Sequence, residues 1–158
     1  MSSALAASVL PSAGIGRNPI AARERFELSA EANPRHARQL RADFQEWLRT
    51  LGAPAALVDD LALAVYEALA NAVDHAYQPH HPHPVMHLQA RVDHNQVLIT
   101  IRDHGCWRPP PPKPGYRGRG LAMMRSLTTE LDIHPTTHGT TVQLRADLHS
   151  SVSFSAAH

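Results

Sequence analysis

The sequence predicts an α/β protein in which helices pack on one face of a mixed, mostly antiparallel sheet, as a two-layer α/β sandwich. Two observations carry this prediction. Apolar residues recur at helical spacing in three segments and alternate with polar residues in five shorter segments. Four of the five predicted strands also follow one another as two hairpins, which form antiparallel pairs. The 158 residues suffice for one such domain.

The first half of the chain supplies one strand and two helices. Residues 25–29 alternate in polarity and predict a short strand. Asn33 before Pro34 predicts the start of a helix, and Gly52 predicts its end. A second helix, over residues 56–76, is apolar on nearly every side, and we therefore expect it to be buried.

The second half supplies four strands and one helix. The pairs 85–92 with 97–102, and 130–134 with 140–147, each predict two strands joined by a turn. A third helix is predicted between these hairpins, with apolar residues at helical spacing at Leu121, Met124, Leu127 and Leu131.

The charge balance argues against a general affinity for nucleic acid. Lys and Arg number 15 against 14 Asp and Glu, a net charge of +1, so direct nucleic-acid binding would need a local basic patch. The exposed side of the first predicted helix does carry several arginines, although a solvated surface is the ordinary interpretation of such a row. These are Arg35, Arg38, Arg41 and Arg49.

Polar residues interrupt the buried second helix at intervals of four. Glu67, Asn71 and His75 form one line on a helix otherwise rich in Ala and Leu. Burying a carboxylate and an amide is costly unless a partner compensates them. Neighbouring loops would satisfy such a line, but the Ala-rich surroundings favour a site that faces a cavity.

Two further segments carry residues suited to binding. Arg117-Gly118-Arg119-Gly120 precedes the third helix, where backbone N–H groups, a positive helix end and guanidinium groups suit phosphate oxygens. Asp103 and Gly105 follow a hydrophobic strand, a pattern that is common in turns. The glycine cluster is neither a Walker A loop nor a dinucleotide-binding fingerprint.

In their order and spacing, these segments resemble the Bergerat-fold, or histidine kinase-like, ATPases. The chain reads Glu67-Ala-Leu-Ala-Asn71-Ala-Val-Asp-His75-Ala-Tyr, then Asp103-x-Gly105, Gly118-Arg-Gly120-Leu121 and His138-Gly139-Thr140-Thr141. Within that superfamily, the helix and the Gly-Arg-Gly-Leu sequence look most like the anti-sigma factor serine/threonine kinases. The resemblance covers the chain from about Phe26 to Leu148.

The resemblance implies that the protein binds ATP with Mg²⁺. Asn71 is then the metal ligand, and an amide oxygen suits this hard cation. Asp103 accepts a hydrogen bond from the adenine amino group, with Gly105 allowing close approach and Thr140 supporting the same base edge. The lid over the phosphates includes Gly118 and Gly120. The full set expected at the nucleotide is Asn71, His75, Asp103, Gly105, Arg117, Gly118, Arg119, Gly120, Leu121 and Thr140.

The resemblance also implies a catalytic residue and partners. Glu67 accepts the proton of a serine hydroxyl during phosphotransfer. The implied protein sequesters a sigma factor and phosphorylates an anti-anti-sigma protein of the STAS-domain type, and a homodimer is compatible with it. The alternative is a nucleotide-binding regulatory module of the same fold that binds a protein partner without phosphotransfer. Glu67 favours the kinase, because a pure binding module has no evident need for a buried base.

We expect the ATPase domain to span residues 23–148, between a flexible extension (1–22) and a flexible tail (149–158). No run of about 18 apolar residues predicts a membrane helix. The first basic residue, Arg17, follows the apolar N-terminal stretch, whereas a secretory signal carries its charge in front. With Cys106 as the only cysteine, a cytoplasmic setting without contact to a membrane is expected.

A cluster of histidines lies outside these motifs. His80, His81, His83 and His87 have the residue type that Zn²⁺ or Ni²⁺ prefers. The prolines between them prevent a helix that would align such ligands, and no cysteine completes a structural site. A solvated loop is therefore the favoured interpretation.

Overall fold

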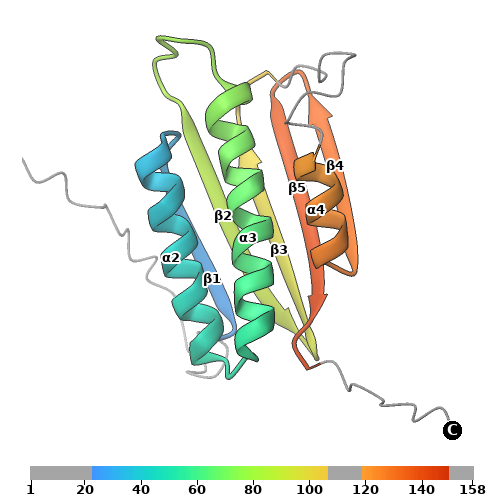
Figure 1. Ribbon diagram of the computed structural model, residues 1–158. Helices are drawn as coiled ribbons and strands as arrows, with labels where there is room; N and C mark the ends of the chain where they lie inside the picture. Colours follow the sequence, from blue (N-terminus) through green and yellow to red (C-terminus); the bar gives the residue numbers. More distant parts are fainter. Residues whose placement is uncertain (1–22, 107–118, 150–158) are drawn as a thin grey trace, which may run out of the picture.

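The computed structural model describes residues 23–106 and 119–149 of the chain and confirms the two-layer architecture (Figure 1). Its elements, in chain order, are β1 (Arg25–Glu31), α2 (Pro34–Thr50), α3 (Ala55–Asn71), the π-helical turn η1 (Ala72–Ala76), β2 (Val85–Asp93), β3 (Gln96–Asp103), α4 (Arg119–Leu127), β4 (Glu130–Thr136) and β5 (Gly139–Asp147).

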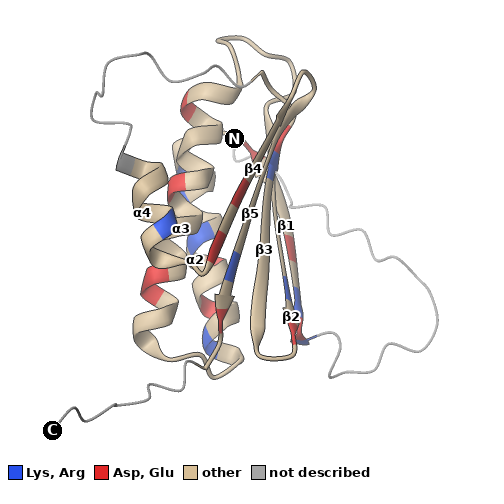
Figure 2. Cartoon of the chain, turned by 90° about the vertical axis from the view of Figure 1, so that its right-hand side faces the viewer, with Lys and Arg blue, Asp and Glu red and all other residues tan. Residues whose placement is uncertain are grey.

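The five strands form one sheet in the order β1-β2-β3-β5-β4. Every pairing between these neighbours is antiparallel, so the antiparallel character that the sequence predicts is complete within the described residues. Helices α2, α3 and α4 all lie on one side of this sheet, as the two views in Figures 1 and 2 show. The opposite side, which we call the open face, carries none of the described helices.

The start and end of α2 follow the sequence signals. The side chain of Asn33 accepts a hydrogen bond from the backbone N–H of His36 at 2.8 Å, and Pro34 occupies the first turn, where its missing N–H costs nothing. Gly52 follows the helix with φ +74°, a left-handed conformation that glycine adopts without the usual steric penalty. The predicted boundaries of this helix are confirmed.

The hydrophobic core lies between the helices and the sheet. Large side chains of α2 and α3 that are fully buried include Phe44, Leu48, Leu61 and Leu69. They pack on alternating strand residues that point toward the helices, namely Met86, Leu88, Ile99 and Leu144. Burying each such side chain is worth about 1.5–3 kcal/mol, which fixes α3 against the middle of the sheet.

The structure decides where the third helix ends. Leu131 continues the helical spacing of Leu127 but also belongs to the predicted strand 130–134; α4 ends at Leu127, and Leu131 lies in β4. The Thr128 hydroxyl donates to the carbonyl of Met124 at 2.7 Å, and the Thr129 N–H donates to the carbonyl of Arg145 at 2.8 Å. The hydrogen bond of Thr129 to β5 therefore ends α4 and starts β4 before another helical turn can form.

None of the helices in the described ranges is both long and apolar enough to cross a membrane. The helix α3 is strongly apolar but has 17 residues, with Asp59 and Asp60 exposed within it.

Candidate functional site

Asp103, the last residue of β3, is one of only two buried polar or charged residues in the described core, with 7% of its surface exposed. Its Oδ1 accepts hydrogen bonds from the backbone N–H of Gly105 at 3.0 Å and of Thr140 at 3.2 Å. Both bonds end on the same oxygen, and this leaves Oδ2 as the atom for an incoming donor.

Burial raises the pKa of the Asp103 carboxyl above its usual 3.8, and the N–H groups of Gly105 and Thr140 oppose the rise without cancelling it. A carboxylate held in this way gains from a ligand that donates a hydrogen bond to it, since the donor offsets the cost of burying the charge.

Two glycines bring the surrounding backbone close to Asp103. A Cβ at Gly105 would lie 1.9 Å from the carbonyl oxygen of Ala76, and a Cβ at Gly139 would lie 2.0 Å from the carbonyl oxygen of Asp103. Gly139 also has φ +142°, which other residues rarely adopt. Neither contact leaves room for a side chain, so both approaches require glycine.

Residues at and just after η1 also hydrogen-bond to the backbone that follows Asp103. The N–H of Cys106 donates to the carbonyl of Ala76 at 2.8 Å, and the N–H of His104 donates to the Tyr77 hydroxyl at 2.8 Å. The same hydroxyl donates to the carbonyl of Val85. Tyr77 thus joins η1, β2 and the end of β3.

Tyr77 and Gly139 lie within the sequence motifs, but no role was predicted for either residue from the sequence. Their contacts join residues that are far apart along the chain, which spacing alone does not reveal. The left-handed preference of glycine in the turn before β5 was the available signal for Gly139.

Thr140 contributes an unused polar atom beside Asp103. Its side-chain Oγ1 is buried, and no hydrogen-bond partner satisfies it within the described residues. Because buried polar atoms of native proteins are nearly always hydrogen-bonded, an unsatisfied hydroxyl next to a buried carboxylate fits a site for a polar ligand. A flat heterocycle with an amino group has the donor that Asp103 needs and an acceptor for Thr140 Oγ1.

Glu67 and Asn71 lie one turn apart near the end of α3, and both are half-buried. A Cβ at Gly120, in the first turn of α4, would lie 2.8 Å from Oε2 of Glu67, so the carboxylate lies directly against the start of α4. No hydrogen bond or ion pair joins either side chain to another described residue. Glu67 therefore lies against α4, and neither its carboxylate nor the amide of Asn71 has a hydrogen-bond or ion-pair partner among the described residues.

The predicted line from Glu67 through His75 is corrected at its last member. The α-helix ends at Asn71 and continues as the π-helical turn η1, which contains His75. Its wider i→i+5 turns change the angular step, so His75 does not extend the line with α-helical geometry. His75 is half-buried in η1.

The remaining predicted residues lie around the start of α4. Gly120 contacts Glu67, as described, and Leu121 packs partly buried against the core. Arg119 is the first residue of α4, but only its backbone belongs to the described part of the chain. Arg117 and Gly118 lie outside the described residues.

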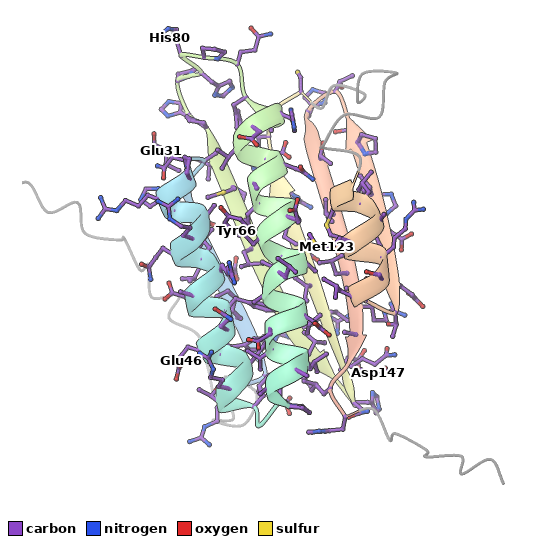
Figure 3. The ribbon with its side chains drawn as sticks, viewed as in Figure 1. Glu31, Glu46, Tyr66, His80, Met123 and Asp147 are labelled. Atoms are coloured by element: carbon purple, nitrogen blue, oxygen red, sulfur yellow. The ribbon has the colours of Figure 1, made fainter. Side chains whose placement is uncertain are left out.

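The arginines of α2 do not form one uniform surface. Arg41 is half-buried, with its guanidinium carbon 5.4 Å from the centre of the Tyr66 ring on α3, and Figure 3 places Tyr66 between the two helices. Arg49 pairs with Glu46 at 3.4 Å. The expectation that four arginines face solvent together is thus corrected for Arg41, which packs α2 onto α3.

Comparison with known proteins identifies a domain family and solved structures of similar fold. The family model described as a histidine kinase-like ATPase domain matches residues 30–146. The RsbU and RsbW domains of Rv1364c from Mycobacterium tuberculosis share 26% identity and superpose with a TM-score of 0.65, over 78% of this chain and 32% of that one.

A second solved structure is the histidine kinase domain of the blue-light activated histidine kinase EL346 from Erythrobacter litoralis. It is 24% identical, with a TM-score of 0.49, over 60% of this chain and 46% of that one. This chain spans less than half the length of each of these two solved chains.

Proposed function

Because the chain belongs to the histidine kinase-like ATPase domain family, we propose that it is an ATP-binding anti-sigma factor with protein serine kinase activity. The observation that carries the proposal is the position of the Glu67 carboxylate, which lies against Gly120 of α4. Glu67 precedes Asn71 by one turn of α3. In this proposal, the side-chain oxygens of Glu67 and Asn71 form one end of the site, and the buried Asp103 at the end of β3 forms the other. About nine residues of helix separate Glu67 from Ala76 beside Gly105, a length of about 13 Å that suits a nucleoside triphosphate bound lengthwise.

The Asp103 end is the proposed adenine site. Oδ2 of Asp103 accepts from the adenine amino group, and the buried hydroxyl of Thr140 supports the neighbouring edge of the base. Gly105 and Gly139 keep this edge narrow, because each replaces a side chain with close backbone contact. A guanine base, which presents a carbonyl at the equivalent position, would place an acceptor against the carboxylate and be rejected.

The Glu67 end is the proposed phosphate site. Asn71 would hold Mg²⁺ through its amide oxygen, and Gly120 with the preceding Arg117, Gly118 and Arg119 would surround the phosphates. When bound, ATP would supply the phosphoryl group, and Mg²⁺ would neutralise the charge of the phosphates. Glu67 orients the serine hydroxyl of the partner and takes up its proton at a carboxylate oxygen.

The proposed partners are a sigma factor, which the protein sequesters, and a STAS-domain anti-anti-sigma protein, which it phosphorylates on serine in the cytoplasm. The similarity to the RsbU and RsbW domains of Rv1364c supports a role among partner-switching regulators. Arg35 and Arg38 of α2 are exposed and offer a local positive surface for an acidic partner.

The test is transfer of label from γ-labelled ATP to a purified STAS-domain protein encoded in the same genome, with its serine-to-alanine variant as control. The proposal expects Mg²⁺-dependent labelling of the native serine and none of the alanine variant. Tight Mg·ATP binding without any transfer would favour the second candidate, a regulatory module that binds nucleotide and partner without kinase activity.

A further inference from the structure

Two histidines meet on the open face of the sheet, behind the proposed nucleotide site. Nε2 of His87, on β2, lies 3.0 Å from Nε2 of His104, the residue after β3, and their rings meet edge to face with centroids 5.0 Å apart. Because successive strand residues point to opposite sides, Asp103 faces the helices while His104 faces away from them. His87 is thus separated from the loop histidines with which sequence reasoning grouped it.

We propose that His87 and His104 form a two-imidazole site for a late first-row divalent cation, with Zn²⁺ as the representative ion. Imidazole nitrogen is a preferred ligand of Zn²⁺, at about 2.0–2.1 Å from the metal. Two such bonds at a tetrahedral angle place the nitrogens about 3.4 Å apart, only a few tenths of an ångström beyond the observed separation. Small side-chain rotations therefore admit the ion.

The second ring nitrogen of His87 has a hydrogen-bond partner, as that of a metal-bound histidine usually does. Oγ of Ser29, on β1, lies 2.6 Å from Nδ1 of His87. When Nδ1–H donates to this hydroxyl, the lone pair of His87 is on Nε2, the atom that faces His104. Metal-bound histidines are oriented in the same way by a hydrogen bond from their second nitrogen.

The surroundings leave space for an ion. A groove of about 150 Å³ is lined by the two histidines with Gln89, Thr100 and Arg102. Burial, and then His104 and Arg102, lower the pKa of His87. Arg102 opposes a cation, whereas Glu27 on β1 acts on His87 with the opposite sign.

The site is open and has two protein ligands. Within residues 23–106 and 119–149, no group of three or more His, Cys, Asp or Glu side chains is placed to hold a metal. Water completes the coordination, as at sites with open positions. The loop with His80 at its tip (Figure 3), His81 and His83 is the competing location, because exposed histidines bind such ions weakly.

The experiment is a competition titration of Zn²⁺ against a chromophoric chelator, using the full chain without a histidine tag in excess Mg²⁺. We expect one Zn²⁺ per chain in the native protein and affinity at least tenfold lower in both His87→Gln and His104→Gln. Ser29→Ala should lose affinity by up to about tenfold, the usual range for an outer-shell partner. The matched control replaces His80, His81 and His83 by Gln together and should retain the native affinity.

A spectroscopic measurement fixes the ligands independently. The Cu²⁺-loaded native chain should show hyperfine coupling to two imidazole nitrogens in electron paramagnetic resonance, and His104→Gln should show one. The proposal is overturned if the native protein fails to compete with the chelator for Zn²⁺, because the two histidines would then form only a hydrogen bond between imidazoles. It is equally overturned if the loop control loses the ion while both pair variants keep it.

Discussion

The two ends of the proposed nucleotide site differ in how the protein holds them. At the Asp103 end, the carboxylate accepts two backbone N–H groups, and two glycines allow backbone contacts closer than any side chain would. At the other end, Glu67 and Asn71 are half-buried and have no described hydrogen-bond partner. The Asp103 end is therefore preorganised. At the other end, the Glu67 carboxylate and the Asn71 amide gain their interactions only when a ligand and a partner bind.

Under the proposed function, the rigid end selects the base and the unpaired end serves catalysis. A rigid pocket recognises a base at low entropic cost, because few groups are ordered on binding. A catalytic base works on a proton that arrives only with the partner protein, so its carboxylate cannot be committed to a permanent donor. Variants at the Asp103 end should mainly change stability and binding, and variants at the Glu67 end should mainly change rate.

The largest effect is expected for Glu67→Gln. The amide keeps the shape of the side chain but cannot accept the serine proton, so phosphotransfer should fall by about 10²–10⁴ while Mg·ATP affinity stays native. Asn71→Ala is the matched comparison one turn away and should lower Mg²⁺-dependent nucleotide affinity as well. A native transfer rate in Glu67→Gln would show that this end holds no general base.

Gly105→Ala should unfold the Asp103 end. The added methyl group would lie 1.9 Å from the Ala76 carbonyl oxygen, and backbone must move to relieve it. We expect a loss of about 2–4 kcal/mol in the free energy of unfolding, together with loss of nucleotide binding. The measurement is urea denaturation followed by calorimetry with Mg·ATP.

Gly52→Ala is the control for that substitution. Gly52, unlike Gly105, has a positive φ, and nothing lies within 4 Å of its Cβ position. Only the conformational penalty of about 1–2 kcal/mol should appear, with native nucleotide affinity. Equal losses of nucleotide affinity in the two variants would contradict a special role for close approach at Gly105.

Nucleotide affinity should depend on pH through Asp103. Its pKa is raised above 3.8 by burial, and adenine binds the ionised form, so affinity should rise as pH increases through the raised pKa. The sign for stability is opposite: the folded state holds this proton more tightly than the unfolded state, so Asp103 contributes a loss of stability over the same rise. Asp103→Asn should bind adenosine more weakly at neutral pH and remove this pH dependence of affinity. A native pH profile in that variant would assign the titration to another group.

The smallest effect concerns the contact between α2 and α3. Arg41→Ala removes a cation–π contact with Tyr66 and should cost about 0.5–1 kcal/mol of stability. Arg38→Ala, on the exposed side of the same helix, should stay within about 0.5 kcal/mol of native. Thermal unfolding of the two variants side by side decides whether Arg41 is a packing residue.

The sequence predicted the elements better than the contacts between them. Asn33 before Pro34 sufficed for the start of α2, because capping is local. Leu131 fitted both the spacing of the third helix and the strand 130–134, and only pairing with β5 decides between them. The π-helical turn was not predictable from Ala72–Ala76, whose composition suits any helix.

The site residues were selected from sequence patterns, their roles came from the resemblance to a family, and the structure adds the physical reasons for their positions. Asp103, Gly105 and Thr140 do meet, because the end of β3 lies beside the start of β5. The role of Gly139 depends on a contact with Asp103, 36 residues earlier in the numbering of the chain. Such a long-range approach has no local signature beyond the glycine itself.

Nuclear magnetic resonance of the ¹⁵N-labelled chain tests most directly whether these two ends belong to one nucleotide site. Adenosine should shift the backbone amides of Gly105 and Thr140 and leave the side-chain amide of Asn71 in place. Mg·ATP should shift all three signals. Saturating Mg·ATP that leaves Gly105 and Thr140 unchanged would contradict the account, and so would an adenosine-induced shift at Asn71 alone.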